Sequence, residues 1–454
     1  MAFHSGGSTV LPLFFLLLPI LLTTLLFPFQ ASQAEALATT SSNSTNIILR
    51  VTKDPETLQH TTIVQQRTPL VPIKLAVDLG GEALWVACEE NGYKSSSFEV
   101  VRCGSATCAT AGFTFCADSC AANPRPWYCD RNACVTTPVN PFTNIHGYAY
   151  SGGQAADDVL GLLLLLGSSN AARGLALANR FVFTCVPVWF SEGLARGVKG
   201  IAGLGANPGA LPTQLSHTFN FLRRKFVVCL SSSTKSSSGF VAFGESVPLK
   251  SDISKSLIYT PIVKHPVGKK YNRVREFSEY YVGLKSIKIN GKPVPLNTTL
   301  LSFDEGGNGG TKISTADPYT VLESSIYQNV IKAFLREIPS NVARVAPVKP
   351  FGACFKLGSL VVPPIDLVFQ SNQKGGSSSV WRISGTNLMV RVNKDVACLG
   401  FVEYRKNLVN RAAVSIGAHQ IEETLLEFDL ILSRVGFSPS LLSRKTSCAL
   451  QLQI

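Results

Sequence analysis

The sequence predicts a mostly β protein made of two similar halves. Short runs rich in Val, Ile, Phe and Tyr alternate with clusters of Gly, Pro, Asn and Ser, which is the pattern of many short strands joined by turns. Each half also repeats one arrangement, in which an apolar strand ends at a sharp turn and two apolar residues followed by glycine come later. Hydrophobic residues make up 45% of the 454 residues, which excludes the intrinsically disordered class. The 36 Gly and 25 Pro interrupt every heptad run and exclude a coiled coil.

The individual elements follow from these patterns. Helices are predicted at 211–223 and 324–336, with a short turn at 422–426. The polar stretches 231–238 and 302–310 are predicted loops. In chain order, the predicted strands are 73–78, 83–88, 181–188, 226–230, 239–244, 280–289, 365–369 and 389–392.

The chain is predicted to contain two β lobes behind a leader. Residues 46–250 form the N-terminal lobe, with a cysteine-rich insertion at 88–134, and residues 280–454 form the C-terminal lobe. The Lys-rich region 251–279 is poor in predicted strands, and we interpret it as an inter-lobe linker.

The first residues are typical of a secreted protein. Residues 10–29 are the only long apolar stretch, and Ala31-Ser32-Gln33-Ala34 follows as a cleavage pattern, so residues 1–34 are interpreted as a signal peptide. A membrane anchor is the alternative, because no Lys or Arg precedes the apolar stretch. The leucine run 162–166 is too short to span a bilayer and predicts a buried strand. We expect a secreted protein with no membrane association after cleavage.

The mature chain is strongly basic. No charged residue lies before Glu35, so removal of the leader keeps the whole formal charge of +13. This charge favours an acidic polysaccharide or an acidic protein as partner. Nucleic acid is not expected, because the longest basic runs are 223–225 and 269–270 and no zinc-finger spacing or RNP-like aromatic pattern occurs.

The twelve cysteines indicate disulfides, the usual state of cysteine in a secreted chain. They are Cys88, Cys103, Cys108, Cys116, Cys120, Cys129, Cys134, Cys185, Cys229, Cys354, Cys398 and Cys448. Nine lie in the first half and three in the second, so pairing of all twelve within one chain requires an odd number of bridges between the halves. No C-x-x-C pair occurs and only six His are present, so neither a metal site nor a cofactor is expected. The sequons at Asn43 and Asn297 predict N-glycosylation.

The repeated arrangement carries a recognisable motif. In the first half a strand ends in Val77-Asp78-Leu79-Gly80 and Ile201-Ala202-Gly203 follows, whereas in the second half a strand ends in Ile313-Ser314-Thr315-Ala316 and Val414-Ser415-Ile416-Gly417 follows. From about Leu70 to Phe437 this layout resembles the pepsin-like aspartic proteases, in which each lobe contributes an Asp-Thr/Ser-Gly loop. The resemblance implies a bilobal pepsin-like aspartic protease fold with a central cleft.

The catalytic chemistry of that family requires two carboxylates that share one proton. Asp78 supplies the first, although Leu79 replaces the usual Thr or Ser, and Ser314 stands where the second Asp should be. A serine hydroxyl does not ionise at neutral or acidic pH, and Asp317 is three residues away, up to about 10 Å along an extended chain. The stretch 147–153 lacks the Tyr-Gly-x-Gly arrangement of the family's flap, and no Gly-x-Ser-x-Gly elbow occurs. We therefore interpret Asp78 and Ser314 as remnant positions and expect no enzyme activity.

Longer stretches are similar to one group of plant proteins, above all KISTADPYTVLESSIY at 312–327 and SIGAHQIEETLLEFDL at 415–430. The group comprises extracellular dermal glycoproteins, xylanase inhibitors of the TAXI type, basic 7S globulins and gamma-conglutins. The resemblance implies a secreted inhibitor of microbial endoglucanases or xylanases, acting in plant defence in the apoplast or cell wall. Its partners would be a microbial glycoside hydrolase and acidic cell-wall polysaccharide. A seed storage or hormone-binding globulin is the second hypothesis, and a residual aspartic endopeptidase is the third.

The same resemblance implies roles for single residues. Cys354 and Cys398 match a bridge common in the C-terminal lobe of pepsin-like proteins, which leaves Cys448 to cross to the first lobe; a free Cys448 is the alternative. In members that inhibit family 12 endoglucanases, two loop arginines enter the enzyme's cleft, and the matching residues here are Arg344 and Arg411. An arginine fork pairs bidentately with a glycosidase carboxylate, although ordinary solvated arginines are the alternative. No His occupies 403–414, where family 11 xylanase inhibitors of the group use one, so family 12 enzymes are the expected targets.

Overall fold

The computed structural model describes residues 45–88, 93–110, 115–116, 132–136, 138–143, 153–166, 173–235, 237–244, 249, 252–266, 278–358, 361–371, 378–404 and 412–451. The predicted signal peptide lies outside these residues, and so do most of the predicted flap stretch and the residues Asn43, Cys120, Cys129 and Arg411.

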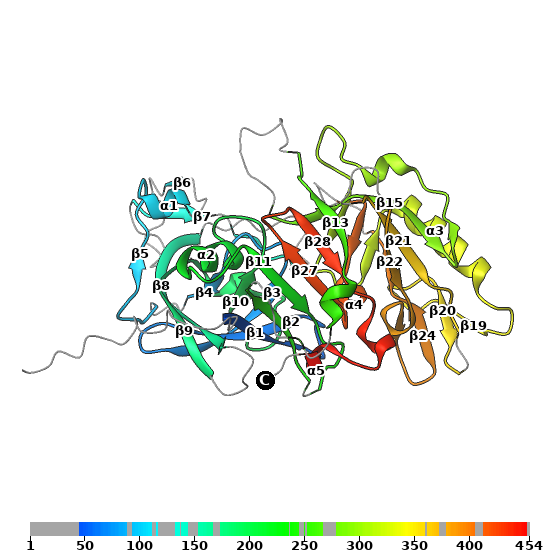
Figure 1. Cartoon of the computed structure of the whole chain (residues 1–454), viewed down its shortest axis with the longest axis horizontal. Helices are drawn as coiled ribbons and strands as arrows, with labels where there is room; N and C mark the ends of the chain where they lie inside the picture. The colour runs from blue at the N-terminus through cyan, green and yellow to red at the C-terminus, as the bar shows by residue number, and fades with distance from the viewer. Residues whose placement is uncertain are drawn as a thin grey trace, which may run out of the picture. The chain divides into compact units, whose positions relative to one another are not determined.

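Strands build both halves, which confirms the mostly β prediction (Figure 1). In the first half they are β1 (Thr45–Lys53), β2 (His60–Gln66), β3 (Val71–Asp78), β4 (Trp85–Ala87), β5 (Glu99–Val100), β6 (Phe115–Cys116), β7 (Cys134–Thr136), β8 (Gly153–Leu166), β9 (Arg173–Val186), β10 (Gly200–Gly203), β11 (Lys225–Cys229) and β12 (Gly239–Phe243).

The later strands are β13 (Ile258–Val263), β14 (Tyr280–Val282), β15 (Leu284–Ile289), β16 (Lys292–Pro293), β17 (Thr311–Ile313), β18 (Thr320–Leu322), β19 (Arg344–Val345), β20 (Cys354–Lys356), β21 (Ile365–Phe369), β22 (Ser379–Ile383), β23 (Met389–Arg391), β24 (Val396–Leu399), β25 (Phe401–Glu403), β26 (Val414–Ile416), β27 (Leu425–Asp429) and β28 (Arg434–Phe437). The α-helices of the described residues are α1 (Ala106–Thr110), α2 (Leu211–Thr218), α3 (Ser324–Glu337), α4 (Ala418–Ile421) and α5 (Cys448–Gln451). Short 3₁₀ turns are η1 (Val188–Ser191), η2 (Asp252–Ser256), η3 (Thr298–Leu301), η4 (Gly385–Asn387) and η5 (Leu441–Arg444).

Alternation of side chains along the strands creates the cores. On β1, Ile47, Leu49 and Val51 point into the main hydrophobic core, whereas Ile48 faces a second apolar cluster on the other side of the sheet. This strand pairs along one edge with β12 and along the other with β8 and β2, so the hydrogen-bonding groups of both of its edges are used within the sheet. The leucine run predicted as a buried strand is the end of β8.

The repeated motif has the same topology in both halves. Strand β3 lies parallel to β10, which places Gly203 opposite Asp78, and β17 lies parallel to β26 in the second half. A Cβ at Gly203 would stand 2.4 Å from the carbonyl oxygen of Ala83, so only glycine allows the backbones to approach this closely. The apolar-apolar-Gly signal in the sequence therefore has a steric cause.

The two halves are joined by shared sheet pairing. Strand β11 of the first half pairs with β27 of the second, and β13 pairs with β28, as the green and red strands of Figure 1 show. At this junction the rings of Phe226 and Phe428 stack with centroids 4.8 Å apart. A disulfide between Cys229 and Cys448 also crosses from one half to the other.

The cysteines of the described residues form five bridges. They are Cys88–Cys185, Cys103–Cys116, Cys108–Cys134, Cys229–Cys448 and Cys354–Cys398. The last pair and the bridge from Cys448 to the first half agree with the pairing that the resemblance implied. Cys354 and Cys398 face each other across β20 and β24, so strand register brings the two sulfurs together.

Three local predictions differ from the structure. Helix α2 ends at Thr218 instead of 223, because Phe219 takes an extended conformation and the neighbouring Thr and Asn are weak helix formers. The turn predicted at 422–426 is wrong, since β27 begins at Leu425 and is held by pairing with both β11 and β28. The region 251–279 is not poor in strands, because its β-branched and aromatic segment Ile258–Val263 forms β13. The domain boundaries themselves stay predictions.

Candidate functional site

The first motif loop places a buried carboxyl group at the end of a strand. Asp78 closes β3, is only 7% exposed, and accepts a hydrogen bond from the Gly80 N–H at Oδ1 over 2.9 Å. Its carbonyl oxygen accepts from Leu204 N–H at 2.8 Å, which fastens the loop to the end of β10. The carboxyl group is therefore held by local backbone geometry and needs no ligand to fix its position.

Ser314 occupies the corresponding place in the second half. It directly follows β17, and its N–H donates to the Ile416 carbonyl oxygen at 2.9 Å. Its hydroxyl oxygen accepts from the N–H groups of Ala316 at 3.2 Å and Asp317 at 3.1 Å. The serine thus stabilises its turn by side-chain hydrogen bonds, as Asp78 does in the first half, but offers no carboxyl group.

The two motif loops contact each other through Thr315. Its hydroxyl donates to the Val77 carbonyl oxygen at 2.9 Å and accepts from the Leu79 N–H at 3.0 Å. Leu79 has no hydroxyl to make the reciprocal bonds and lies fully buried in the core. The loops carrying Asp78 and Ser314 therefore lie side by side. The hydroxyl of Thr315 connects them, and no equivalent hydroxyl reaches back from Leu79.

An ion pair lies beside this position. Lys312 Nζ is 2.5 Å from Glu279 Oε1, and the Glu279 side chain packs over Gly80. Ser278, the preceding residue, donates through its hydroxyl to the Gly80 carbonyl oxygen. The segment at 278–279 thus covers the loop of Asp78 with a salt bridge. This pair was not predicted from the sequence; the one available signal was a lysine next to Ile313 in the segment that leads to Ser314.

Asp317, three residues after Ser314, is held by a contact within the second half. Its carboxylate accepts a hydrogen bond from the Ser415 hydroxyl at 2.6 Å, which directs the side chain to β26. The charge of Asp317 nevertheless contributes to raising the pKa of Asp78.

The surroundings change the acidity of the groups at this position. Burial raises the pKa of Asp78 to about 6, although the Gly80 N–H opposes the shift, and the nearby Glu279 carboxylate raises it further. Burial alone would also raise the pKa of Glu279, but the Lys312 ammonium holds it below its ordinary value. The site therefore contains one titratable carboxyl group of raised pKa beside a neutralised ion pair, with no second carboxyl group in the place of Ser314. Among the described residues no group of three or more His, Cys, Asp and Glu side chains is arranged to hold a metal ion.

Arg344 lies on an exposed strand above a disulfide. It pairs with Phe355 across β19 and β20, and its neighbour Val345 pairs with the bridged Cys354. Its guanidinium is exposed and donates through Nη2 to the Leu335 carbonyl oxygen near the C-terminal end of α3. Pairing with the disulfide-bonded strand β20 therefore fixes the backbone that carries Arg344. Arg411, the other predicted contact, lies outside the described residues.

Asn297 is exposed and begins the turn η3. Its Oδ1 accepts hydrogen bonds from the Thr299 N–H at 3.2 Å and the Thr299 hydroxyl at 2.7 Å. An exposed amide in a surface turn is accessible to modification, and glycosylation at Asn297 stays a prediction.

These features define a class: a two-lobed pepsin-like protein whose paired motif loops carry Asp in one half and Ser in the other. The chain matches two family models. One is described as "Xylanase inhibitor N-terminal" and matches residues 60–245, and the other is described as "Xylanase inhibitor C-terminal" and matches residues 279–439. The chain therefore belongs to the xylanase inhibitor family.

Relatives and solved structures agree with this assignment. The chain is 44% identical over 445 residues to the probable aspartic proteinase GIP2 of Nicotiana benthamiana, covering 95% of this chain and 96% of the relative. It is 37% identical to basic 7S globulin of Glycine max, covering 89% and 90% of the two chains. The crystal structure of edgp superposes with a TM-score of 0.79 at 43% identity, covering 91% of this chain and 99% of that chain.

Proposed function

We propose that this protein is a secreted, catalytically inactive pepsin-like protein that inhibits microbial cell-wall-degrading glycoside hydrolases. The observation that carries the proposal is that Asp78 and Ser314 occupy equivalent positions in two motif loops that contact each other through Thr315. An acid–base mechanism requires two groups that exchange a proton in concert, and here the second group is a hydroxyl that serves a turn. Membership of the xylanase inhibitor family supports the inhibitory role.

Inhibition would work through cations on loops of the second half. A glycosidase cleft presents two carboxyl groups about 5–9.5 Å apart, depending on mechanism. Arg344 is exposed on a strand whose neighbour is anchored by the Cys354–Cys398 bridge, so binding would order little of its backbone. We propose that Arg344 and Arg411 enter the cleft of an endoglucanase of family 12, or of a xylanase as the second choice.

Arg344→Ala tests the contact. We expect inhibition to weaken at least tenfold, partly because enzyme carboxylates would be left unpaired in a dry interface. Thermal stability should change little, since Arg344 makes one exposed hydrogen bond to the end of α3. The measurement is titration of the purified protein against family 12 endoglucanases and family 11 xylanases, with Arg411→Ala in parallel.

Lys356→Ala is the matched control, because Lys356 is an exposed cation on the adjacent strand β20. It should inhibit as well as the parent. If both arginine variants also inhibit as well as the parent against a confirmed target, these arginines are not the contact.

Residual proteolysis is the second candidate function, and the name of one relative, together with the titratable Asp78, favours testing it. An assay at acidic pH against a denatured protein, with and without an aspartic-protease inhibitor, decides it. We expect no inhibitor-sensitive cleavage by the parent, and negligible cleavage by Ser314→Asp, because Leu79 and the altered flap stretch remain. A seed-globulin role would instead show as accumulation in seed storage compartments without inhibition of either hydrolase family.

The same proposal has three further parts. The leader is cleaved near Ala34; Asn43 and Asn297 carry N-linked glycans; and the protein resides in the apoplast or cell wall. Among the described residues no helix is long and apolar enough to cross a membrane. The formal charge of +13 favours retention on acidic cell-wall polysaccharide, which elution of the protein from pectate by rising salt would measure.

A further inference from the structure

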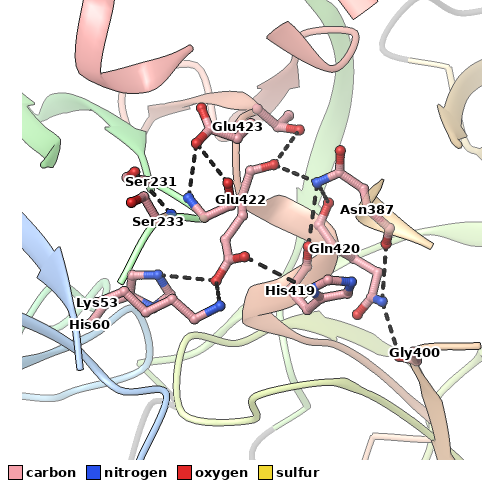
Figure 2. A network of polar contacts seen from close by, with 12 residues as sticks. Lys53, His60, Ser231, Ser233, Asn387, Gly400, His419, Gln420, Glu422 and Glu423 are labelled. Atoms are coloured by element: carbon pink, nitrogen blue, oxygen red, sulfur yellow. Dashed lines mark hydrogen bonds and ion pairs between the residues drawn. The ribbon is translucent and has the colours of Figure 1, made fainter. Parts of the chain in front are cut away.

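A buried carboxylate joins the two lobes at a place remote in sequence from both motif loops (Figure 2). Glu422 directly follows α4 and is only 2% exposed. Its Oε1 lies 2.8 Å from Lys53 Nζ and 3.3 Å from His60 Nε2, and its Oε2 lies 3.7 Å from His419 Nδ1. One carboxylate of the second lobe is therefore surrounded by an ammonium and two imidazoles.

The positions of these groups are fixed by backbone pairing. Lys53 at the end of β1 and His60 at the start of β2 are direct partners across a hairpin of the first lobe. Glu422 is held by a bridge to Leu230 and by its carbonyl oxygen, which accepts from Asn387 Nδ2 at 2.5 Å. The backbones that carry the donors and the acceptor are therefore each anchored, and only the side chains must be ordered when they meet.

The other ionisable groups nearby do not compete for these donors. The Glu423 carboxylate turns to the opposite side, as Figure 2 shows, and accepts from the Ser232 N–H at 2.9 Å and the Cys448 N–H at 2.7 Å. The Tyr319 ring lies 6.0 Å from the His419 ring and completes the surroundings on the α4 side. The charged and titratable groups that face Glu422 are therefore Lys53 from β1, His60 from β2, and His419 with Tyr319.

These surroundings favour the ionised carboxylate. Burial alone would raise the pKa of Glu422, but the adjacent imidazoles of His419 and His60 and the Lys53 ammonium hold it far below its ordinary value. An imidazole nitrogen can donate to a carboxylate whether the ring is neutral or protonated, so both histidines are compatible with an ionised neighbour.

We propose that Glu422, Lys53, His60 and His419 form a charge clamp that keeps the two lobes joined in acidic surroundings. The direction in which the stabilisation changes with pH follows from proton linkage. A carboxyl group ionised more readily in the folded than in the unfolded chain stabilises the fold above its unfolded pKa of about 4.3, and that stabilisation is lost only as pH falls toward the lower folded pKa. The carboxylate would thus stay ionised in the folded chain at pH values where ordinary carboxylates have become neutral, while the contribution of the clamp to stability declines progressively over that range.

Glu422→Gln tests the clamp, because the amide keeps the shape and removes the charge. We expect the thermal midpoint to fall by about 5 °C or more at pH 7, since Lys53 loses its buried partner. The same fall should be present at pH 4 and should shrink only at lower pH. Glu337→Gln is the control: Glu337 pairs with Lys292, which is 71% exposed, and the midpoint should change by about 1 °C or less.

A second measurement covers the case in which Glu422→Gln does not fold. Carbon-13 NMR of the parent protein with labelled Glu carboxyl groups should show one signal that does not titrate between pH 6 and 3.5, and Lys53→Met should shift that signal. The proposal is overturned if the signal titrates near pH 4.3, if the parent and Glu422→Gln converge by pH 4, or if the variant is as stable as the parent at pH 7.

Discussion

Asp78 illustrates at the scale of one residue what burial does to a carboxyl group that faces a serine loop in the other half. In a catalytic pair of aspartates, the raised pKa of one carboxyl group lets it hold the proton that the two share. Here the raised pKa has a cost instead, because the folded chain holds the Asp78 proton more tightly than the unfolded chain does. The cost is absent below the unfolded pKa near 3.9 and grows as pH rises through about 6.

Asp78→Asn should therefore stabilise the protein at neutral pH. The amide oxygen can still accept the Gly80 N–H, while the buried charge is removed. We expect a gain of about 1–3 kcal/mol at pH 7 that disappears near pH 4. Thermal midpoints of parent and variant from pH 4 to 7.5 measure this, and an equal gain at both ends of that range would show that charge is not the cause.

At the scale of elements, the parallel pairs β3·β10 and β17·β26 are the repeated units of the fold. In the first half the backbone after β3 packs closely against Gly203 at the end of β10, and Gly203→Ala tests this packing. We expect a loss of about 2–4 kcal/mol, because the added methyl group would meet backbone atoms that cannot move alone. Gly174→Ala on β9 is the control, since a Cβ there has open space, and its thermal midpoint should match the parent's.

The repetition also explains which features the sequence could predict. Asp78 and Ser314 were found because each follows an apolar strand and precedes a matching glycine-ended strand, a pattern that is local and occurs twice. The partnership of Lys312 with Glu279, and that of Lys53 with Glu422, left no such trace. Each joins residues brought together by strands that pair over long sequence distances, and a single charged residue in an apolar stretch does not reveal its partner. The predicted turn at 422–426 overlaps the start of β27 for a similar reason. Pairing of β27 with β11 overrides the local preference of these residues.

At the scale of the whole molecule, the lobes are coupled in two separate regions. The β11·β27 ladder, the charge clamp and the Cys229–Cys448 bridge adjoin one another near the end of β11, whereas the hydrogen bonds of Thr315 connect the motif loops. Coupling at separated points favours unfolding of both lobes in one transition over stepwise loss of one lobe. A clamp that fails in acid would leave the other contacts in place, so its loss should lower stability without separating the halves.

The bridge from Cys448 gives the last prediction. Cys229 and Cys448 are 219 residues apart, and closing so long a loop in the unfolded chain is nominally worth about 5 kcal/mol. The double variant Cys229→Ser with Cys448→Ser should lose at most this amount, because measured contributions of a crosslink often fall short of the chain-entropy value. The N–H at position 448 can still donate to Glu423, and the Leu441 N–H to the Glu423 carbonyl oxygen, so the end of the chain keeps part of its attachment. We expect a clear fall in thermal midpoint together with faster proteolysis confined to the chain after Leu441, where α5 loses its covalent anchor. Non-reducing peptide mapping of the parent should find Cys229 and Cys448 in one linked peptide pair, and a free thiol at Cys448 would refute the crossing bridge.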